Sequence, residues 1–175
     1  VKNLENDINA KTYLLKRNIN EDMAQNFNLG LSKDSWDNIT NLLVKKNKMK
    51  EGVDLGLLVK NKDKTYDRFR NRIMFHIRNT SGNIIAFGGR TLDKNDNAKY
   101  INSPESKLFY KSNEVYGLFE SKQHINKVDQ IIVVEGYTDV IALHQNGIKN
   151  AVAALGTAFT KFHINKLLRY SKNIV

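Results

Sequence analysis

The chain has 175 residues, of which 41% are hydrophobic, enough to build the core of one sizeable domain or two small ones. Its 28 Lys and Arg against 18 Asp and Glu give a net charge of +10, so the surface should attract polyanions unless the charge serves solubility alone. No apolar run approaches the roughly 18 residues of a membrane span, the first twenty residues carry charges rather than a signal segment, and the absence of Cys excludes disulfides and thiolate zinc sites.

Residues 1–60 have the apolar spacing of helices. One apolar face is expected to continue across a helix, a turn and a second helix, and it is formed by Leu14, Leu15, Ile19 and Met23. A further helical run is expected from Ser35, a cap residue, through Trp36 to Val44. The sequence therefore predicts a small helical pack in this part, and the cytosol is the expected compartment.

The character of the chain changes at Arg72. Two apolar, β-rich runs, residues 73–77 and 84–87, flank a Gly-containing loop, which predicts a β-hairpin. Pro104 lies in a predicted loop between the two halves of the chain.

Strand and helix patterns alternate from about Val128 onward. The order is a strand at 130–134, a helix at 138–145, a strand at 151–155, a helix at 161–170, and the start of another strand at 173–175. This alternation is typical of βαβ units with a parallel sheet. Both ends of the chain, Val1 and Val175, are interpreted as internal to a longer protein.

Two carboxylates follow the first of these strands. Glu135 stands at the strand's carboxyl end, and Asp139 falls in the first turn of the following helix. Ligands of parallel α/β sheets bind at the carboxyl ends of strands, and two carboxylates there suit Mg²⁺. The alternative is that Asp139 complements the helix dipole and Glu135 is a surface charge.

Arginine is concentrated in one short stretch. Five of the seven Arg residues fall within residues 68–90, where there is no Asp or Glu. Arg holds phosphates bidentately, so the stretch is interpreted as a nucleic-acid-binding face rather than a solvated one. The Lys99-Tyr100 pair and the Phe109-Tyr110-Lys111 run combine cations with aromatic rings, which can stack on bases.

Ten segments of the chain, taken in order, resemble the catalytic core of bacterial DnaG-type primases. They are Tyr13–Arg17, Trp36–Asn38, Tyr66–Arg70, Arg72–Phe75, Ile85–Arg90, Lys99–Glu105, Leu108–Lys111, Tyr116–Leu118, Val134–Val140 and Ala154–Thr157. The segment around Glu135 also resembles Toprim domains, the metal-binding fold shared with topoisomerases and some nucleases. The resemblance implies an α/β fold in which an α+β basic subdomain, residues 1–127, precedes the first βαβαβ part of a Toprim domain, residues 128–175.

The resemblance also implies roles for individual residues. Glu135 and Asp139 would be catalytic residues and ligands of Mg²⁺ or Mn²⁺. The positions that match the groove for template DNA and nucleotide or primer are Arg90, Lys99, Tyr100 and Lys111, with Arg17, Arg68, Arg70 and Arg72 as weaker candidates. The implied activity is that of a nucleotidyltransferase that copies single-stranded DNA into a short RNA primer from NTPs.

The chain departs from the family's pattern in several places. Asn18 stands where the family has Gly and His76 where it has Pro, and no Asp or Glu follows Asp139. The rest of the metal site, a zinc-binding domain, and most contacts with the replicative helicase and single-stranded DNA-binding protein are therefore expected outside this chain, which alone should be inactive. The alternatives are another Toprim enzyme, such as a topoisomerase or nuclease, and a non-catalytic single-stranded DNA-binding module.

Overall fold

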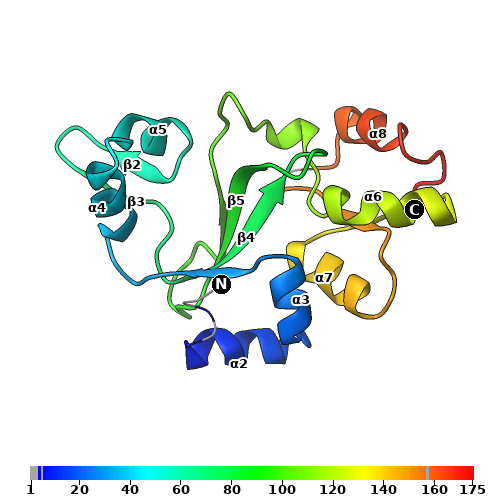
Figure 1. Ribbon diagram of the computed structural model, residues 1–175, viewed down its shortest axis with the longest axis horizontal. Coiled ribbons are helices and arrows are strands. Elements are labelled where there is room, and N and C mark those ends of the chain that lie inside the picture. Colours follow the sequence, from blue (N-terminus) through cyan, green and yellow to red (C-terminus); the bar gives the residue numbers. More distant parts are fainter. Residues whose placement is uncertain (1–3, 5, 157) are drawn as a thin grey trace.

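A computed structural model describes residues 4, 6–156 and 158–175 of the chain (Figure 1). Its helices are α2 (Ile8–Lys16), α3 (Glu21–Asn26), α4 (Asn38–Lys45), α5 (Met49–Asp54), the 3₁₀ helix η1 (Lys111–Asn113), α6 (Leu118–Val128), α7 (Tyr137–Gln145) and α8 (Lys161–Leu167). Its strands are β1 (Gly30–Ser32), β2 (Leu58–Lys60), β3 (Thr65–Asp67), β4 (Arg72–Arg78), β5 (Ile84–Thr91), β6 (Tyr100–Asn102), β7 (Ile132–Val134) and β8 (Ala151–Ala153). None of these helices is long and apolar enough to cross a membrane.

An antiparallel sheet in the order β1–β4–β5–β6 forms the middle of the molecule (Figure 1). The predicted hairpin is confirmed as β4 and β5, and a backbone bond from Asn79 N–H to the Asn83 carbonyl, 3.0 Å long, closes its turn. Ile73, Phe75 and Ile77 alternate along β4 and are fully buried, because every second side chain of a strand faces the same side. The hairpin thus supplies one wall of the core.

Helices α2 and α3 pack together, as the apolar spacing predicts, but with one difference. Leu14 and Ile19 are buried, whereas Leu15 is 69% exposed, so it does not belong to the shared apolar face. A residue next to Leu14 on a helix points about 100° away from it, which explains the error. Asn18 has a positive φ of 54°, a conformation that Gly adopts readily and Asn tolerates, so Asn in place of the family's Gly is compatible with this turn.

The region from residue 30 to 67 is not the purely helical pack that the sequence predicts. Strand β1 joins the main sheet, and β2 and β3 pair with each other as an antiparallel ribbon. Helix α4 begins at Asn38 rather than near Ser35, and its first amides are bound by the Asp67 carboxylate, 2.7 Å from Ile39 N and 2.8 Å from Thr40 N. The cap comes from β3, so local sequence could not reveal it.

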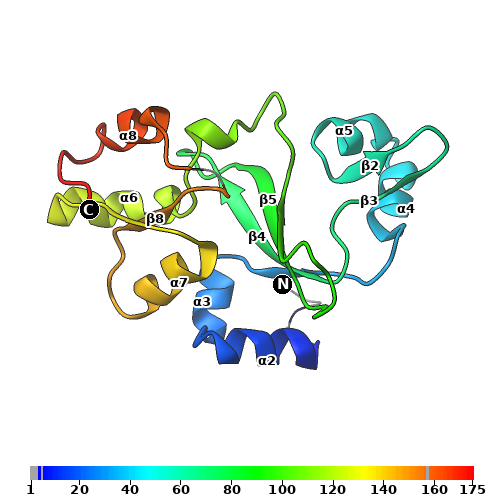
Figure 2. The ribbon, with the colours of Figure 1, turned by 180° about the vertical axis from the view of Figure 1, so that it is seen from behind.

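The alternating strand and helix order is confirmed in the C-terminal part. Strands β7 and β8 are parallel, and an isolated parallel bridge between Ile131 and Ile174 adds the chain's last residues to the other edge of β7. Figure 2 shows α6, α7, α8 and β8 gathered at one end of the molecule, with α4 and α5 at the other. The strands are shorter than predicted, and α8 ends at Leu167 instead of reaching Tyr170.

The core connects the C-terminal part to the main sheet. The Tyr137 ring, at the start of α7, stacks on Phe75 of β4 with centroids 4.8 Å apart, and Tyr116 contacts both rings. Gly88 of β5 leaves room for this contact, since a Cβ there would lie 2.6 Å from the Tyr137 ring. The loop that carries Glu135 is therefore held against the hairpin.

Candidate nucleic-acid interface and metal site

Glu135 and Asp139 lie on either side of the first residues of α7. Strand β7 ends at Val134, Glu135 follows it, and Asp139 belongs to the first helical turn; both carboxylates are exposed. The Asp139 Oδ2 atom lies 3.2 Å from the place that a Cβ on Gly136 would take, so this side chain leans back over the Glu135–Gly136 loop. Gly136 thus allows the second carboxylate to approach the loop that bears the first.

The donor set of these two residues fits a hard divalent cation. Carboxylate oxygens are ligands that Mg²⁺ and Mn²⁺ accept, and Mg²⁺ commonly uses one or two protein carboxylates together with water and phosphate oxygens. Within the described ranges, no three His, Cys, Asp or Glu side chains gather into a metal site. Glu135 and Asp139 can therefore supply part of a metal site.

Tyr137 and Asn102 connect this loop to the main sheet. The Tyr137 hydroxyl donates to Asn102 Oδ1 at 2.7 Å, and the Asn102 amide donates to the Leu155 carbonyl at 3.0 Å. Burial raises the pKa of Tyr137, so the phenol stays protonated and can keep donating. The loop of residues 135–136, which we call the carboxylate loop, is consequently fixed to β6 and to the segment after β8.

A cluster of two arginines and two tyrosines, which we call the Arg–Tyr cluster, lies next to Tyr137. The Arg90 guanidinium carbon is 5.4 Å from the Tyr100 ring centroid and 5.6 Å from that of Tyr13, and Arg17 lies 5.8 Å from the Tyr13 ring. The rings of Tyr100 and Tyr137 are 6.2 Å apart. Helix α2, β5 and β6 therefore bring Arg17, Arg90 and Tyr100 together, close to the carboxylate loop.

Tyr13 is a member of this cluster that sequence reasoning did not select. Its hydroxyl lies 3.5 Å from that of Tyr100, and burial together with this contact raises the pKa of Tyr13 to about 12. The segment Tyr13–Arg17 resembles the primase family, and this resemblance could have identified Tyr13 as a site residue. The apolar periodicity around Tyr13 indicated only an amphipathic helix.

The two predicted lysines are placed on separate segments. Lys99 precedes β6, is exposed, and its carbonyl lies 3.5 Å from Arg90 Nη1. Lys111 begins η1, and its backbone N–H donates to the Glu105 carboxylate at 2.9 Å. Within the part of the chain that the structure describes, neither ammonium group has a hydrogen-bond or ion-pair partner. Both are free to bind an anion.

Arg70 forms a second aromatic group with Trp36 and Tyr66. Its guanidinium carbon lies 3.8 Å from the Trp36 ring centroid and 5.5 Å from that of Tyr66. Trp36 is 63% exposed, so the stack faces solvent. Arg68 stands two residues before Arg70 and is partly buried. These residues belong to the end of the molecule that carries α4 and β3.

The arginines of residues 68–90 do not form one continuous binding face. Arg72 is 6% exposed, forms an ion pair with Asp96, and donates to the Ala98 carbonyl at 2.8 Å. Arg78, at the other end of β4, pairs with Glu120 at 3.4 Å. The acidic partners come from outside the stretch, which is why local composition overstated its free charge. The Arg72 guanidinium is therefore occupied by partners within the protein.

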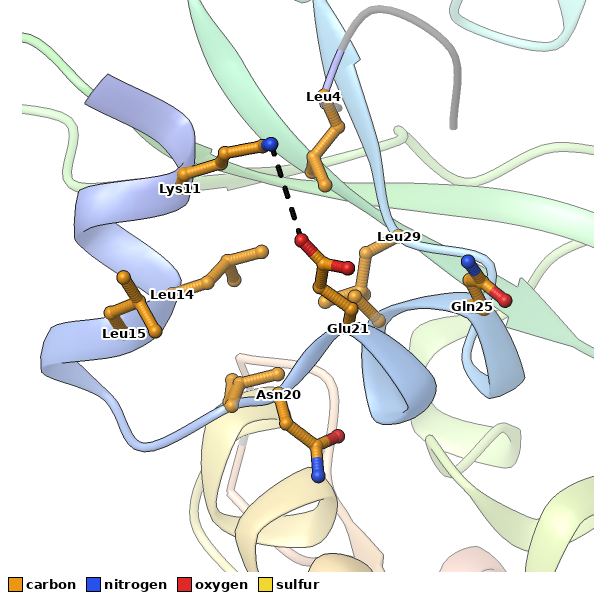
Figure 3. Close-up of a pocket in the computed structure, with 10 residues that line it drawn as sticks. Leu4, Lys11, Leu14, Leu15, Asn20, Glu21, Gln25 and Leu29 are labelled. Atoms are coloured by element: carbon orange, nitrogen blue, oxygen red, sulfur yellow. Dashed lines mark ion pairs between the residues drawn. The ribbon is translucent and has the colours of Figure 1, made fainter. Parts of the chain in front are cut away.

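A cleft of about 150 Å³ between α2 and α3 contains none of the predicted site residues. Leu14, Leu29 and other aliphatic side chains line it, and Lys11 and Glu21 face each other across it at 4.0 Å (Figure 3). Most of this lining is aliphatic, and its Lys11 ammonium faces the Glu21 carboxylate, an arrangement that does not favour a charged nucleotide.

Comparison with known proteins gives consistent relatives over the whole chain. The family described as the N-terminal domain of the DNA primase catalytic core matches residues 1–122, and the Toprim domain matches residues 129–175. A DNA primase of Pseudomonas aeruginosa is 50% identical over 95% of this chain, and one of Clostridium acetobutylicum is 44% identical over 99%. The chain spans 25% and 29% of the length of these two curated relatives.

Solved structures agree with the relatives and with the predicted fold class. A DnaG primase catalytic domain bound to single-stranded DNA is 43% identical, with a TM-score of 0.89 over 95% of this chain and 52% of its own. The zinc-binding and RNA polymerase domains of the Aquifex aeolicus primase give a TM-score of 0.90 at 33% identity, over 98% of this chain and 42% of theirs. The α/β fold with a Toprim part is confirmed. The chain therefore belongs to the family of the DNA primase catalytic core.

Proposed function

We propose that this chain is part of a DNA primase, a nucleotidyltransferase that copies single-stranded DNA into short RNA primers from NTPs. The observation that carries this proposal is the contact between the Arg–Tyr cluster and the carboxylate loop through Tyr100 and Tyr137. This contact supports the proposal, because it connects a cationic, aromatic surface suited to nucleic acid with the segment that bears two carboxylates suited to a divalent cation. A relative of the same fold was solved with single-stranded DNA bound, which supports that strand as the template class.

The cationic and aromatic residues of this surface would have different roles in binding. Arg17, Arg90, Lys99 and Lys111 would neutralise backbone and triphosphate oxygens, while the Tyr100 ring would stack on a base. Arg68 and Arg70, with Trp36, would extend the surface along the strand. Charge-stabilising groups of this kind, held in place before substrate binds, are the main contribution a protein makes to phosphoryl transfer.

Glu135 and Asp139 would act at the reacting phosphate. Mg²⁺ or Mn²⁺ held by their oxygens, when bound, would offset charge on the NTP phosphates. The hydrogen bond between the Tyr137 hydroxyl and Asn102 supports this role, because it ties the start of α7, two residues after Glu135, to β6. Residues beyond this chain would complete the site, in keeping with the share of the relatives' length that the chain spans.

The replacement Glu135→Gln tests this proposal in a chain extended to the full catalytic core of its relatives. It removes a charge but preserves shape, so primer synthesis from labelled NTPs should be lost while single-stranded DNA affinity and thermal stability stay unchanged. Glu21→Gln, at an exposed carboxylate of α3 to which no role in binding is assigned, is the matched control. Retained synthesis in the Glu135→Gln protein would contradict the catalytic role.

The two other functions raised by the sequence predict different products. A Toprim topoisomerase or nuclease would relax or cleave DNA, and a binding module would do neither. The primase relatives at 44% and 50% identity favour RNA products over both. Labelled RNA that depends on a single-stranded template separates the three functions.

A further inference from the structure

Side chains of α8 and of its N-cap residue, Thr160, bind the backbone carbonyls of all three residues of η1. The carbonyls of Lys111, Ser112 and Asn113 lie 2.8 Å from His163 Nε2, 3.0 Å from Thr160 Oγ1 and 3.0 Å from Lys166 Nζ, respectively. A single 3₁₀ turn satisfies few of its own carbonyls, so these bonds determine its position. Figures 1 and 2 both show α8 beside this segment.

His163 is the fully buried member of this set. Its side chain is 0% exposed, its Nδ1 atom lies 3.0 Å from the Thr160 backbone N, and its ring stacks on Phe159 at 5.2 Å. His163 and Thr160 together form a capping box, a motif in which the third helical residue is ordinarily Glu or Gln. Those residues can cap the helix too, but the imidazole carries a second nitrogen on the far side of the ring.

The partners of the two ring nitrogens determine the tautomer. A backbone N–H can only donate, so Nδ1 must accept from Thr160 and carries no proton. The Lys111 carbonyl can only accept, so Nε2 must carry the proton and donate to it. A neutral imidazole with hydrogen on Nε2 satisfies both bonds. A doubly protonated ring would place its Nδ1–H opposite the Thr160 N–H, and two donors cannot form a hydrogen bond with each other.

The Lys111 backbone is consequently held on both sides. Its N–H donates to Glu105 and its carbonyl accepts from His163, while its ammonium group has no partner among the described residues. An ammonium on a fixed backbone loses less conformational freedom when it binds a phosphate, which is the advantage of preorganisation.

We infer that His163 is a positioning residue that fixes Lys111 for contact with a phosphate of the bound nucleic-acid strand. The inference rests on the proposed function, because it requires Lys111 to touch the strand. His163 itself touches neither strand nor nucleotide and acts through the backbone of η1.

Two substitutions of His163 that differ by one methylene test the inference. Gln can accept from Thr160 and still reach the Lys111 carbonyl, whereas Asn can accept from Thr160 but is too short for the second bond. We would measure binding of the whole chain to an oligodeoxythymidylate over a range of salt concentrations. Both variants would be combined with Lys111→Ala, and His144→Gln, at another buried histidine, would serve as the control.

The expected result is a non-additive cycle. Lys111→Ala should reduce the slope of log affinity against log salt by about 0.7, the value for one phosphate contact on a single strand. His163→Asn should reduce it by a similar amount, with no further reduction in the double variant. His163→Gln and His144→Gln should leave the slope unchanged.

Each other outcome has a definite meaning. If His163→Asn lowers the slope as much with Ala at 111 as with Lys, or leaves it unchanged with Lys, the positioning role is wrong and the proposed function stands. If Lys111→Ala alone has no effect, the strand-binding role of Lys111 fails and the inference fails with it. The ¹⁵N shifts of His163 in the unmodified chain give a measurement that needs no variant: a proton on Nδ1 would overturn the inference.

Discussion

At the scale of single residues, the partners of a charged side chain separate structural from functional roles. Asp67 and Arg72 are 2% and 6% exposed, and each is bound by groups far away in the sequence. Glu135, Asp139 and Lys99 are exposed. Burying a charge is costly unless it is paired, so the first two are needed for the fold, whereas the others are available to ligands.

Asp67→Ala should destabilise the protein by about 2 kcal/mol, because it removes a buried cap. The carboxylate accepts from Ile39 N, from Thr40 N and from the Thr40 hydroxyl, each within 2.8 Å, and these donors would be left without an acceptor. Urea unfolding measures the loss.

Asp37→Ala provides the matched control for this prediction. Asp37 occupies the cap position of α4 in sequence, yet its side chain makes no cap bond and is exposed. Its replacement should cost much less than that of Asp67. Equal losses would show that α4 is capped locally and that the bond from β3 contributes nothing.

At the scale of elements, the sequence predicted those whose signal is local and periodic. The β4–β5 hairpin and the β7–α7–β8–α8 order follow from apolar runs separated by turns. The short strands β1, β2, β3 and β6 were missed. Strands β7 and β8 are equally short, but they lie within longer apolar runs that alternate with helical patterns, whereas a strand such as β1 is defined by a distant partner, Met74 for Gly30. The Arg72–Asp96 and Asp67–α4 contacts were missed for the same reason.

The candidate site could be predicted to a similar extent. Glu135, Asp139, Arg90 and Tyr100 stand in recognisable segments, so residue type and order were enough to select them. Their grouping depends on Tyr13 and Tyr137, which join α2, β5, β6 and α7 through ring contacts. Contacts between elements so far apart in the chain leave no local pattern.

Stability should fall with acidity because of His144, which connects α7 to α6 and β8. Its Nε2 atom lies 3.0 Å from Ser121 Oγ and 3.3 Å from the Ala151 carbonyl, and burial lowers its pKa to about 4 from 6.5. The His144 imidazole is protonated near pH 6.5 in the unfolded chain but only near pH 4 in the folded chain. Stability is therefore fully present above pH 6.5 and is lost as the pH falls toward 4.

The size of this effect is measured by comparison with His144→Gln, which keeps polar groups but cannot titrate. The pKa difference corresponds to up to about 3 kcal/mol of unfolding free energy. Urea unfolding across this pH window should show a smaller decline in the variant than in the unmodified chain. Parallel declines would mean that other groups, and not His144, cause the acid sensitivity.

At the scale of the whole molecule, the net charge of +10 leaves open which cations bind DNA, because some Lys and Arg side chains are exposed and others are paired within the protein. Replacing Arg17, Arg90 and Lys99 together with Ala should reduce the salt slope of single-stranded DNA binding by about 2, since each phosphate contact contributes about 0.7. The matched control replaces Lys127, Arg169 and Lys172, three exposed cations on and around α6 and α8, which lie at one end of the molecule and away from α2 (Figure 1). Equal reductions in both proteins would assign binding to overall charge rather than to the Arg–Tyr cluster.

A polypeptide of these 175 residues should make no primers at any Mg²⁺ concentration, even with template and all four NTPs. Glu135 and Asp139 are the only Asp or Glu residues after Asp129, and no three candidate ligands gather in the described part of the chain. Mg²⁺ requires near-octahedral geometry and dehydrates reluctantly, so two carboxylates without further ligands should hold it weakly.

The decisive comparison uses a second chain extended to the full catalytic core of the relatives, of whose solved domain this chain covers 52%. Labelled RNA on a single-stranded template should come from the extended chain alone, because we expect the further metal ligands to come from the added residues. Primers from the short chain would mean that Glu135 and Asp139 suffice for catalysis. If neither chain makes labelled RNA although each binds the template, the result would count against the primase function itself. Binding without synthesis is the behaviour of a strand-binding module.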